Sequence, residues 1–296
     1  MDIVRGEGGL SWHLGGAPAN AAAAASKLGL EVGMIATVGD DFFGAHTIQA
    51  LDHYRIFREG VRTSKKHPTS LALATSETET TERFTFYRAA DTEIKPWQTR
   101  AYHIDRNTTF TFGSLSLVAQ RLRRVLIDSL TYAQEAGATI IFDANYRSSL
   151  WKSGEHFRAS VNDVYRFVDV IKVNRVEAEV LTGQREPTEA AKLLHNSGIP
   201  IVLITLGEQG CLAMSSAGTI VRPIDKIVES PDVIGTGDAF IGGCIAHTIT
   251  YGARITDLDS VELGYTIDAG QKSAYEVACV LGAGWDIEAN YSDSSR

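Results

Sequence analysis

A glycine-rich turn that leads into a helix-prone segment is the feature of this sequence with the clearest chemical meaning. It reads Gly235-Thr236-Gly237-Asp238-Ala239-Phe240. Two glycines allow the backbone to come close to a ligand. The amides at a helix N-terminus, together with the helix dipole, favour a bound anion. An aspartate in the first turn, Asp238, would then lie next to any group held beside that anion.

Transfer of a terminal phosphate to a hydroxyl group is a reaction that such a segment suits. This reaction needs positioning, charge stabilisation and an acceptor for the hydroxyl proton rather than covalent help. The amides of Gly235, Thr236 and Gly237 would stabilise the charge. Asp238 would accept the proton if its carboxylate lies about 2.6–3.2 Å from the hydroxyl. The motif alone fits a simpler interpretation equally well, in which Asp238 caps a helix and the glycines form a turn.

Two other nucleotide-binding motifs are absent or incomplete. The chain contains no GxxxxGK[ST] segment, which argues against a P-loop kinase. Gly6-Glu7-Gly8 resembles part of a dinucleotide fingerprint, but no complete strand precedes it and no helix follows it directly. An NAD-dependent oxidoreductase would need that complete strand–loop–helix unit.

The elements that must position the glycine-rich turn alternate between strands and helices. This alternation predicts a mostly parallel sheet that is covered by helices on both faces. Ligands bind beyond the carboxyl ends of such strands, and polar residues gather there at 143–145, 174–177 and 205–207. The strands expected are 31–38, 109–112, 139–143, 170–173 and 201–205, and the helices are 21–28, 43–54, 119–136, 157–167, 176–181, 188–197, 235–251 and 263–281.

Two β-rich segments interrupt this alternation. Residues 69–76 and 83–88 flank a polar tip, which predicts a hairpin that projects from the main sheet. A second hairpin is expected from 211–215 and 219–221.

Composition excludes several classes of protein. The 296 residues carry a net charge of −8, which argues against nucleic acid as the main partner. The longest apolar run, 239–250, is broken by glycines, so no membrane span is expected. The three cysteines are far apart in the sequence and form no pair or ligand cluster, which is typical of a reducing compartment and makes the cytoplasm the expected location.

Seven short motifs follow one another along nearly the whole chain. They are Gly15-Gly16-Ala17-Pro18-Ala19-Asn20, Val38-Gly39-Asp40-Asp41-Phe42-Phe43-Gly44, Phe86-Tyr87-Arg88, Asp143-Ala144-Asn145-Tyr146-Arg147, Asn174-Arg175-Val176-Glu177, Thr205-Leu206-Gly207-Glu208-Gln209-Gly210 and Gly235-Thr236-Gly237-Asp238. In this order they resemble the signatures of the PfkB (ribokinase-like) carbohydrate kinases, and of fructokinases in particular. Several ordered motifs are far more specific than any one of them.

The resemblance implies a fold. It is a single ribokinase-like α/β domain over residues 1–296, with a mostly parallel central sheet flanked by helices and a small β lid formed by roughly 4–14 and 69–88. The family usually opens with a strand that ends in a sugar-binding aspartate. Asp2 corresponds to that aspartate, so the upstream half of the strand is expected to be missing here. A homodimer through the lid is a further expectation, because exposed sheet edges invite pairing.

The resemblance also implies how the reaction is carried out. Asp238 would be the catalytic base, and the amides of Gly235, Thr236 and Gly237 would hold the terminal phosphate of ATP. The residues expected to bind the sugar are Asp2, Gly15, Gly16, Asn20, Arg88, Asn145 and Arg147. Arg88 ends the predicted lid hairpin, so it could close over the substrate.

Nucleotide and metal sites follow from the same likeness. Asn174, Thr205, Gly207 and Gly210 would line the nucleotide pocket. Asn174 and Glu177 would organise Mg²⁺, largely through water, which suits a cation that dehydrates reluctantly. Asp232 would belong to a site for a monovalent cation such as K⁺.

Simpler interpretations exist for several of these residues. Asn20 would cap the alanine-rich helix, and Asn174 would cap another, with Glu177 as a solvated acid in its first turn. The arginines would lie on the surface, and the segment 205–210 would be a plain strand-to-turn junction.

The sequence departs from the fructokinase pattern beside the glycine-rich turn. Val233 and Ile234 replace two threonines, and Thr236 replaces an alanine. The function implied is an ATP-dependent sugar kinase that acts on D-fructose. The alternatives are a kinase of 2-keto-3-deoxygluconate, ribose or a riboside, and a non-catalytic relative that binds sugar or nucleotide.

Overall fold

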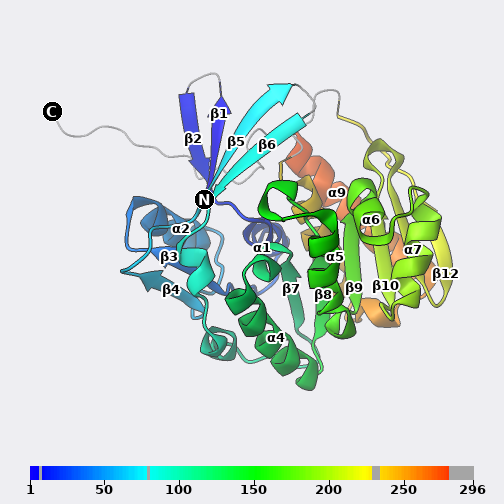
Figure 1. Cartoon of the computed structure of the whole chain (residues 1–296). Coiled ribbons are helices and arrows are strands. Elements are labelled where there is room, and N and C mark those ends of the chain that lie inside the picture. Colours follow the sequence, from blue (N-terminus) through cyan, green and yellow to red (C-terminus); the bar gives the residue numbers. More distant parts are fainter. Residues whose placement is uncertain (7–8, 79–80, 229–233, 280–296) are drawn as a thin grey trace.

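A sheet of six strands forms the centre of the molecule (Figure 1). The computed structural model describes residues 1–6, 9–78, 81–228 and 234–279. The sheet has the order β12-β11-β10-β9-β8-β7. Its strands are β7 (Thr109–Gly113), β8 (Thr139–Asp143), β9 (Val170–Asn174), β10 (Ile201–Thr205), β11 (Cys211–Ser215) and β12 (Gly218–Arg222). The first four are parallel, and β11 and β12 form the predicted second hairpin.

Helices cover both faces of this sheet. One face carries α4 (Gln120–Glu135), α5 (Gly154–Asn162), α6 (Arg175–Thr182) and α7 (Pro187–Asn196). The other carries α8 (Thr236–Thr250) and α9 (Ser260–Ala278), and α1 (Ala17–Lys27) packs against α8. The remaining helices are α2 (Phe42–His53) and the short α3 (Leu115–Val118). None of the helices in the described ranges is long and apolar enough to cross a bilayer.

Strand alternation explains why the central strands are apolar on both sides. Ile140 and Phe142 of β8 pack toward the α4–α7 side, whereas Ile141 packs against α8 and α9. In β9, Ile171 faces the first side and Val170 the second. Successive side chains of a strand point to opposite faces, so a sheet with two covered faces needs continuous apolar runs.

The two segments predicted to form the lid lie in one separate sheet, which projects from the body in Figure 1. Its strands are β1 (Asp2–Gly6), β2 (Gly9–His13), β5 (Leu71–Thr78) and β6 (Thr81–Tyr87), in the order β2-β1-β5-β6. β5 and β6 are the predicted hairpin. β1 pairs antiparallel with β2 and parallel with β5. This arrangement brings Asp2 to the base of the sheet, where it meets the body.

A third, two-stranded sheet is formed by β3 (Ala36–Gly39) and β4 (Val61–Ser64). The strand expected at 31–38 is therefore shorter than predicted. The Tyr102 hydroxyl donates to the carbonyl of Met34, which satisfies a backbone group that a longer strand would have paired. A cavity of about 840 Å³ lies between residues 32–35 and β7. None of the predicted site residues that the structure describes lines it.

One predicted helix is interrupted. Residues 157–167 form the end of α5 and then a separate 3₁₀ turn over Tyr165–Phe167. Val161, Val164 and Phe167 are all buried. Their spacing of three residues suits a helix or a 3₁₀ turn equally well, so the pattern could not separate them.

The motif over 38–44 has a structural role. The Asp41 carboxylate caps α2 by accepting from the Gly44 amide at 2.8 Å. It also accepts from the amide and the hydroxyl of Thr69, each at 2.7 Å. Asp41 therefore fixes α2 to the segment that leads into β5.

Candidate active site

The glycine-rich turn begins α8 as predicted. Gly235 is the N-cap residue, with a φ of 77°, and helical residues start at Thr236. Glycine adopts this left-handed conformation at no steric cost. A Cβ atom on Gly237 would lie 2.7 Å from Nζ of Lys172, so a side chain at this position would displace the ammonium group. The first turn of α8 therefore presents backbone and the positive end of its dipole.

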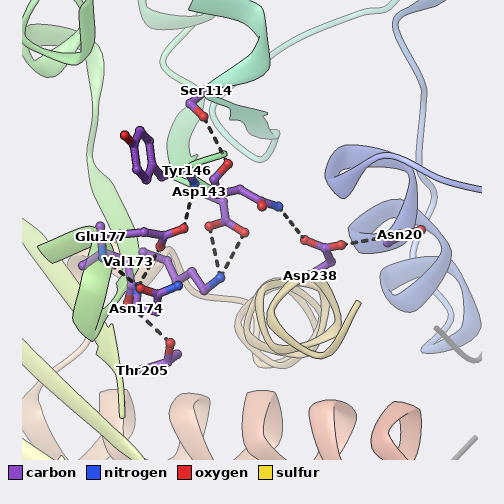
Figure 2. Close-up of polar contacts among 11 residues, drawn as sticks. Asn20, Ser114, Asp143, Tyr146, Val173, Asn174, Glu177, Thr205 and Asp238 are labelled. Carbon is purple, nitrogen blue, oxygen red and sulfur yellow. Dashed lines mark hydrogen bonds and ion pairs between the residues drawn. The ribbon is translucent and has the colours of Figure 1, made fainter. Parts of the chain in front are cut away.

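Asp238 lies in that first turn, between two side-chain amides (Figure 2). Asn20 Nδ2 donates to its Oδ2 at 2.8 Å, and Asn145 Nδ2 donates to its Oδ1 at 3.3 Å. Asp238 is 7% exposed. Its carboxylate therefore faces polar groups of α1 and of the loop after β8, and not the apolar core. Helix capping does not account for these contacts, because the N-cap residue is Gly235.

Asn145 is aimed at Asp238 by an unusual backbone conformation. Its φ is 38°, in the left-handed region that asparagine tolerates better than most residues. The Ser114 hydroxyl donates to its carbonyl at 3.3 Å and supports the loop. Asn20 reaches Asp238 from α1, which packs closely on α8.

A buried ion pair lies beside the same turn. Lys172 Nζ is 3.1 Å and 3.2 Å from the two carboxylate oxygens of Asp143. The alternation that places Ile141 and Val170 against α8 continues two residues farther along each strand. Asp143 and Lys172, which are paired in register, therefore project toward the start of α8.

Burial and charge set the protonation of the proposed base. Burial, and then the negative charge of Asp143, raise the pKa of Asp238 to about 7. The hydrogen bond from Asn20 and the positive charges of Lys172 and Arg147 oppose this rise. An acid with a pKa near 7 changes charge readily at neutral pH, which suits a general base.

The predicted sugar-binding residues of the N-terminal segment lie together. A Cβ atom on Gly15 would be 2.1 Å from Cγ of Asp2, so the two residues are in direct contact. The Gly16 amide donates to the Asp2 carboxylate. Burial raises the pKa of Asp2, against the opposing effect of nearby positive groups that include Arg147.

Two predicted arginines have different surroundings. The Arg147 guanidinium lies 5.1 Å from the ring centroid of Phe84 in β6, and its charge acts on both Asp2 and Asp238. It therefore lies between the body and the lid sheet. Arg88 instead forms an ion pair with Asp91 and donates to the carbonyl of Leu115 at 3.0 Å. Neither of these contacts joins Arg88 to Asp2 or to Asp238.

Asn174 and Glu177 form a complete capping box at the start of α6. Asn174 Oδ1 accepts from the Glu177 amide, and Glu177 Oε2 accepts from the Asn174 amide, both at 2.8 Å. Glu177 Oε1 accepts from the amide of Tyr146 at 2.7 Å, and Glu177 is only 3% exposed. The capping interpretation is therefore correct for Asn174. Glu177 completes the capping box but is buried, so the alternative that made it a solvated acid is wrong, and the role of both residues toward a metal stays a prediction.

The remaining predicted residues lie at or near the carboxyl end of β10. Thr205 is paired in register with Asn174, and its hydroxyl donates to the carbonyl of Val173 at 3.4 Å. Gly207 has a φ of 61° with open space around it. A Cβ atom on Gly210 would lie 2.0 Å from the carbonyl oxygen of Arg222, which requires glycine there for packing alone. Asp232 lies outside the described residues.

No group of three or more histidine, cysteine, aspartate or glutamate side chains that could hold a metal ion occurs in the described part of the chain. Mg²⁺ usually keeps several waters and binds through one or two carboxylates together with substrate phosphates. The donors at Asn174 and Glu177 fit that mode of binding, and they do not form a direct cage.

Sequence reasoning missed Lys172. A signal was present, because Val170-Ile171-Lys172-Val173 places one charged residue inside an apolar strand. A charge buried in a strand requires a partner, and Asp143, at the end of the preceding strand, provides it.

Comparisons with known proteins show the family of this chain. The family model "pfkB family carbohydrate kinase" matches residues 6–284. The chain is 31% identical to Fructokinase-2 of Solanum lycopersicum over 274 residues, which is 91% of this chain and 80% of that protein. It is 33% identical to Fructokinase-1 of Zea mays over 248 residues, which is 82% of this chain and 76% of that protein.

Solved structures share the fold. One is a double mutant of fructokinase from Vibrio cholerae O395 with fructose, ADP and a potassium ion bound. It has a TM-score of 0.84 and 22% identity, over 95% of this chain and 90% of that chain. Another is aminoimidazole riboside kinase from Salmonella enterica with aminoimidazole riboside and an ATP analogue, with a TM-score of 0.83 and 23% identity over 95% and 91% of the two chains. The predicted ribokinase-like α/β fold is confirmed, and the chain belongs to the pfkB family of carbohydrate kinases.

Proposed function

We propose that this protein transfers the terminal phosphate of ATP to a hydroxyl group of D-fructose. The observation that carries the proposal is the place of Asp238. It lies in the first turn of α8, receives hydrogen bonds from Asn20 and Asn145, and has a pKa near 7. Fructose is favoured over other sugars because several curated relatives at 31–33% identity are fructokinases.

Asp238 accepts the proton of the attacking hydroxyl in this proposal. Loss of the proton makes the sugar oxygen a better nucleophile, and the phosphorus–oxygen bond to ADP breaks as the new bond forms. The amides of Gly235, Thr236 and Gly237 stabilise the negative charge on the transferred group. Support comes from the left-handed Gly235 at the N-cap and from Gly237, whose missing Cβ leaves room for the Lys172 ammonium beside the turn.

Asn20 would bind a sugar hydroxyl while it orients the base. Its Nδ2 is occupied by Asp238, and its Oδ1 is buried with no hydrogen-bond partner among the described residues. A buried acceptor without a partner is costly. A sugar hydroxyl that donates to Oδ1 would remove this cost. Asp2, positioned by Gly15 and Gly16, would accept from further hydroxyls.

Arg147, Asn145 and Arg88 would complete the sugar site. Arg147 follows β8 in the body and lies against Phe84 of the lid sheet, which also contains Asp2. Movement of that sheet would therefore change the position of Arg147 relative to both lid residues. Arg88 would reach a substrate only if it released Asp91, which makes it the weaker candidate. The four-stranded sheet would act as a lid that excludes water during the reaction.

ATP would lie along the carboxyl ends of β9 and β10. Asn174, Thr205, Gly207 and Gly210 line this edge, and Asn174 and Thr205 are adjacent in register. Mg²⁺ would bind the phosphates of ATP, and Asn174 and Glu177 would act on it through water. Asp232 would take part in a site for a monovalent cation such as K⁺, as the potassium ion in the Vibrio cholerae fructokinase suggests.

The edges of the lid sheet favour a homodimer. β2 and β6 are its outer strands, and they carry the exposed side chains of Trp12 and Tyr87. An exposed edge with large apolar side chains is a common pairing site.

The three free cysteines, two of them buried, support a reducing compartment such as the cytoplasm.

The direct test is a kinase assay with a panel of acceptors. Purified protein is incubated with ATP, Mg²⁺ and fructose, 2-keto-3-deoxygluconate, ribose or a riboside, and ADP release is followed. The expected result is turnover with fructose and a much lower kcat/KM for the others. Turnover with a different acceptor would reassign the substrate. Thermal shifts with sugar or ATP but no turnover would favour a non-catalytic binding protein.

A further inference from the structure

The buried pair of Lys172 and Asp143 has no assigned part in the proton transfer. Lys172 is 6% exposed and Asp143 is 5% exposed. The Lys172 ammonium contacts both oxygens of the Asp143 carboxylate. On its other side it lies against Gly237, where a Cβ atom would come within 2.7 Å of Nζ. The ammonium therefore separates a buried carboxylate from the first turn of α8.

Three carboxylates act on this single ammonium group, and they belong to Asp143, Glu177 and Asp238. Glu177 is also stabilised by two backbone amides, and Asp238 by two side-chain amides. Both side-chain hydrogen bonds that the structure gives to the Asp143 carboxylate come from Lys172. Asp143 therefore depends on Lys172 for its compensation more than the other two carboxylates do.

An uncompensated carboxylate at this position would oppose the proposed reaction. Charges in a buried environment are poorly screened by water. Without its lysine partner, the negative charge of Asp143 would therefore repel a phosphate at the start of α8. The same charge would undo the attraction that the helix dipole offers to an anion. Lys172, which contacts this carboxylate and lies against Gly237, neutralises the charge beside the turn.

Resting on the proposed kinase function, we infer that Lys172 is a positioning residue, which neutralises Asp143 and packs against Gly237 so that the first turn of α8 accepts the terminal phosphate of ATP. Lys172 acts through these two residues. It is not the base, and it need not contact the sugar.

The same pair acts on the base, which gives an independent readout. The charge of Asp143 raises the pKa of Asp238, whereas those of Lys172 and Arg147 lower it. These three residues are the charged groups that act on Asp238 from β8, β9 and the loop after β8. Removal of Lys172 or of Asp143 should therefore move the acid limb of a pH–rate profile in opposite directions.

The test compares Lys172→Met, Asp143→Asn and the double variant. ATP affinity is measured by calorimetry, and kcat/KM for fructose is measured against pH. Lys172→Met should weaken ATP binding about 100-fold, because it leaves one partner of a buried charge pair unpaired. Its acid limb should move to higher pH. Asp143→Asn should bind ATP at least as tightly as the wild type, with the acid limb moved to lower pH.

The double variant decides whether Lys172 works through Asp143. If it does, the double variant should bind ATP at least about tenfold more tightly than Lys172→Met, because the repelling carboxylate is gone. A double variant as weak as Lys172→Met would overturn the inference, because Lys172 would then contribute directly. Unchanged ATP affinity and pH profile in Lys172→Met would overturn it as well.

Folding and function need separate controls. Lys192→Met removes a lysine that is paired with Glu189 on the exposed side of α7, and it should leave ATP binding and turnover unchanged. If Lys172→Met does not fold, the acid limb of Asp143→Asn still tests the inference. An acid limb that stays at the wild-type pH in Asp143→Asn would refute it. If the wild type phosphorylates no sugar, the proposed function fails, while the ATP affinities of the three variants still decide the role of Lys172.

Discussion

The side-chain amide of Asn20 donates to Asp238 across 2.8 Å, although 218 positions separate the two residues in the chain. This bond joins α1 to the first turn of α8 and fixes which end of the Asn20 amide faces Asp238. The other end, Oδ1, is buried and has no partner within the described residues. One asparagine thus connects the proposed base with the proposed sugar site.

Replacement of Asn20 by alanine should impair sugar binding and shift the pH profile together. The hydrogen bond from Asn20 lowers the pKa of Asp238, so its loss should move the acid limb to higher pH. The fructose KM should rise about 10- to 100-fold, because a buried sugar hydroxyl would be left without its acceptor. Steady-state kinetics over a pH range of about 5–9, which brackets the pKa of the base, measure both effects. A higher KM with an unmoved acid limb would contradict the coupling.

Replacement of Asp238 by asparagine should reduce turnover at least about 1000-fold, because the hydroxyl loses its proton acceptor. ATP affinity by calorimetry should remain close to that of the wild type. A variant that keeps most of its rate would exclude Asp238 as the base.

The same substitution should stabilise the protein at high pH. The folded-state pKa of Asp238, about 7, lies above the ordinary value of 3.8, so the wild type loses stability as pH rises from about 4 to 7. The asparagine side chain of the variant cannot ionise and escapes this loss. Chemical denaturation should therefore give a higher free energy of unfolding for Asp238→Asn than for the wild type at about pH 8, with a smaller difference at about pH 4.

The wild-type pH profile itself should report the ionisation of Asp238. Because the carboxylate must be deprotonated to act, kcat/KM for fructose should fall about tenfold for each pH unit below about 7. A plateau that extends down to about pH 5 would show that Asp238 has the pKa of an ordinary aspartate, or that another group is the base.

Gly15→Ala should displace Asp2. A Cβ atom at position 15 would overlap the Asp2 carboxyl group, with a separation of only 2.1 Å from Cγ. We expect a fructose KM raised about tenfold or more and a lower melting temperature, because either the carboxylate or the backbone must move. Gly154→Ala is the matched control, since its new Cβ would meet Val180 at an ordinary 3.4 Å. Equal kinetics for the two variants would remove Asp2 from the sugar site.

Glu177→Gln should affect both folding and the response to Mg²⁺. The capping box of α6 would lose its charged acceptor, at a cost of about 1 kcal/mol. If Glu177 also acts on Mg²⁺ through water, the Mg²⁺ concentration for half-maximal rate should rise severalfold. Glu262→Gln provides the control, because Asp259 and Glu262 form the same capping box on α9. A loss of stability alone in both variants would leave Glu177 a capping residue only.

The sequence determined the local elements and the type of chemistry. Strand bounds predicted at 139–143 and 201–205 coincide with β8 and β10. The glycine-rich turn begins a helix as expected, and its first turn contains Asp238. These features depend on backbone preferences and short-range periodicity, which are set by residues close together in the sequence.

Only the tertiary structure decided which side chains meet. Lys172 contacts Asp143 because the parallel strands β8 and β9 are paired in a register that places both residues side by side on the α8 face. Asn20 contacts Asp238 because α1 packs against α8. Arg88 pairs with Asp91 and donates to the carbonyl of Leu115. Such contacts join residues far apart in sequence, and they depend on register and helix packing, which no local pattern specifies.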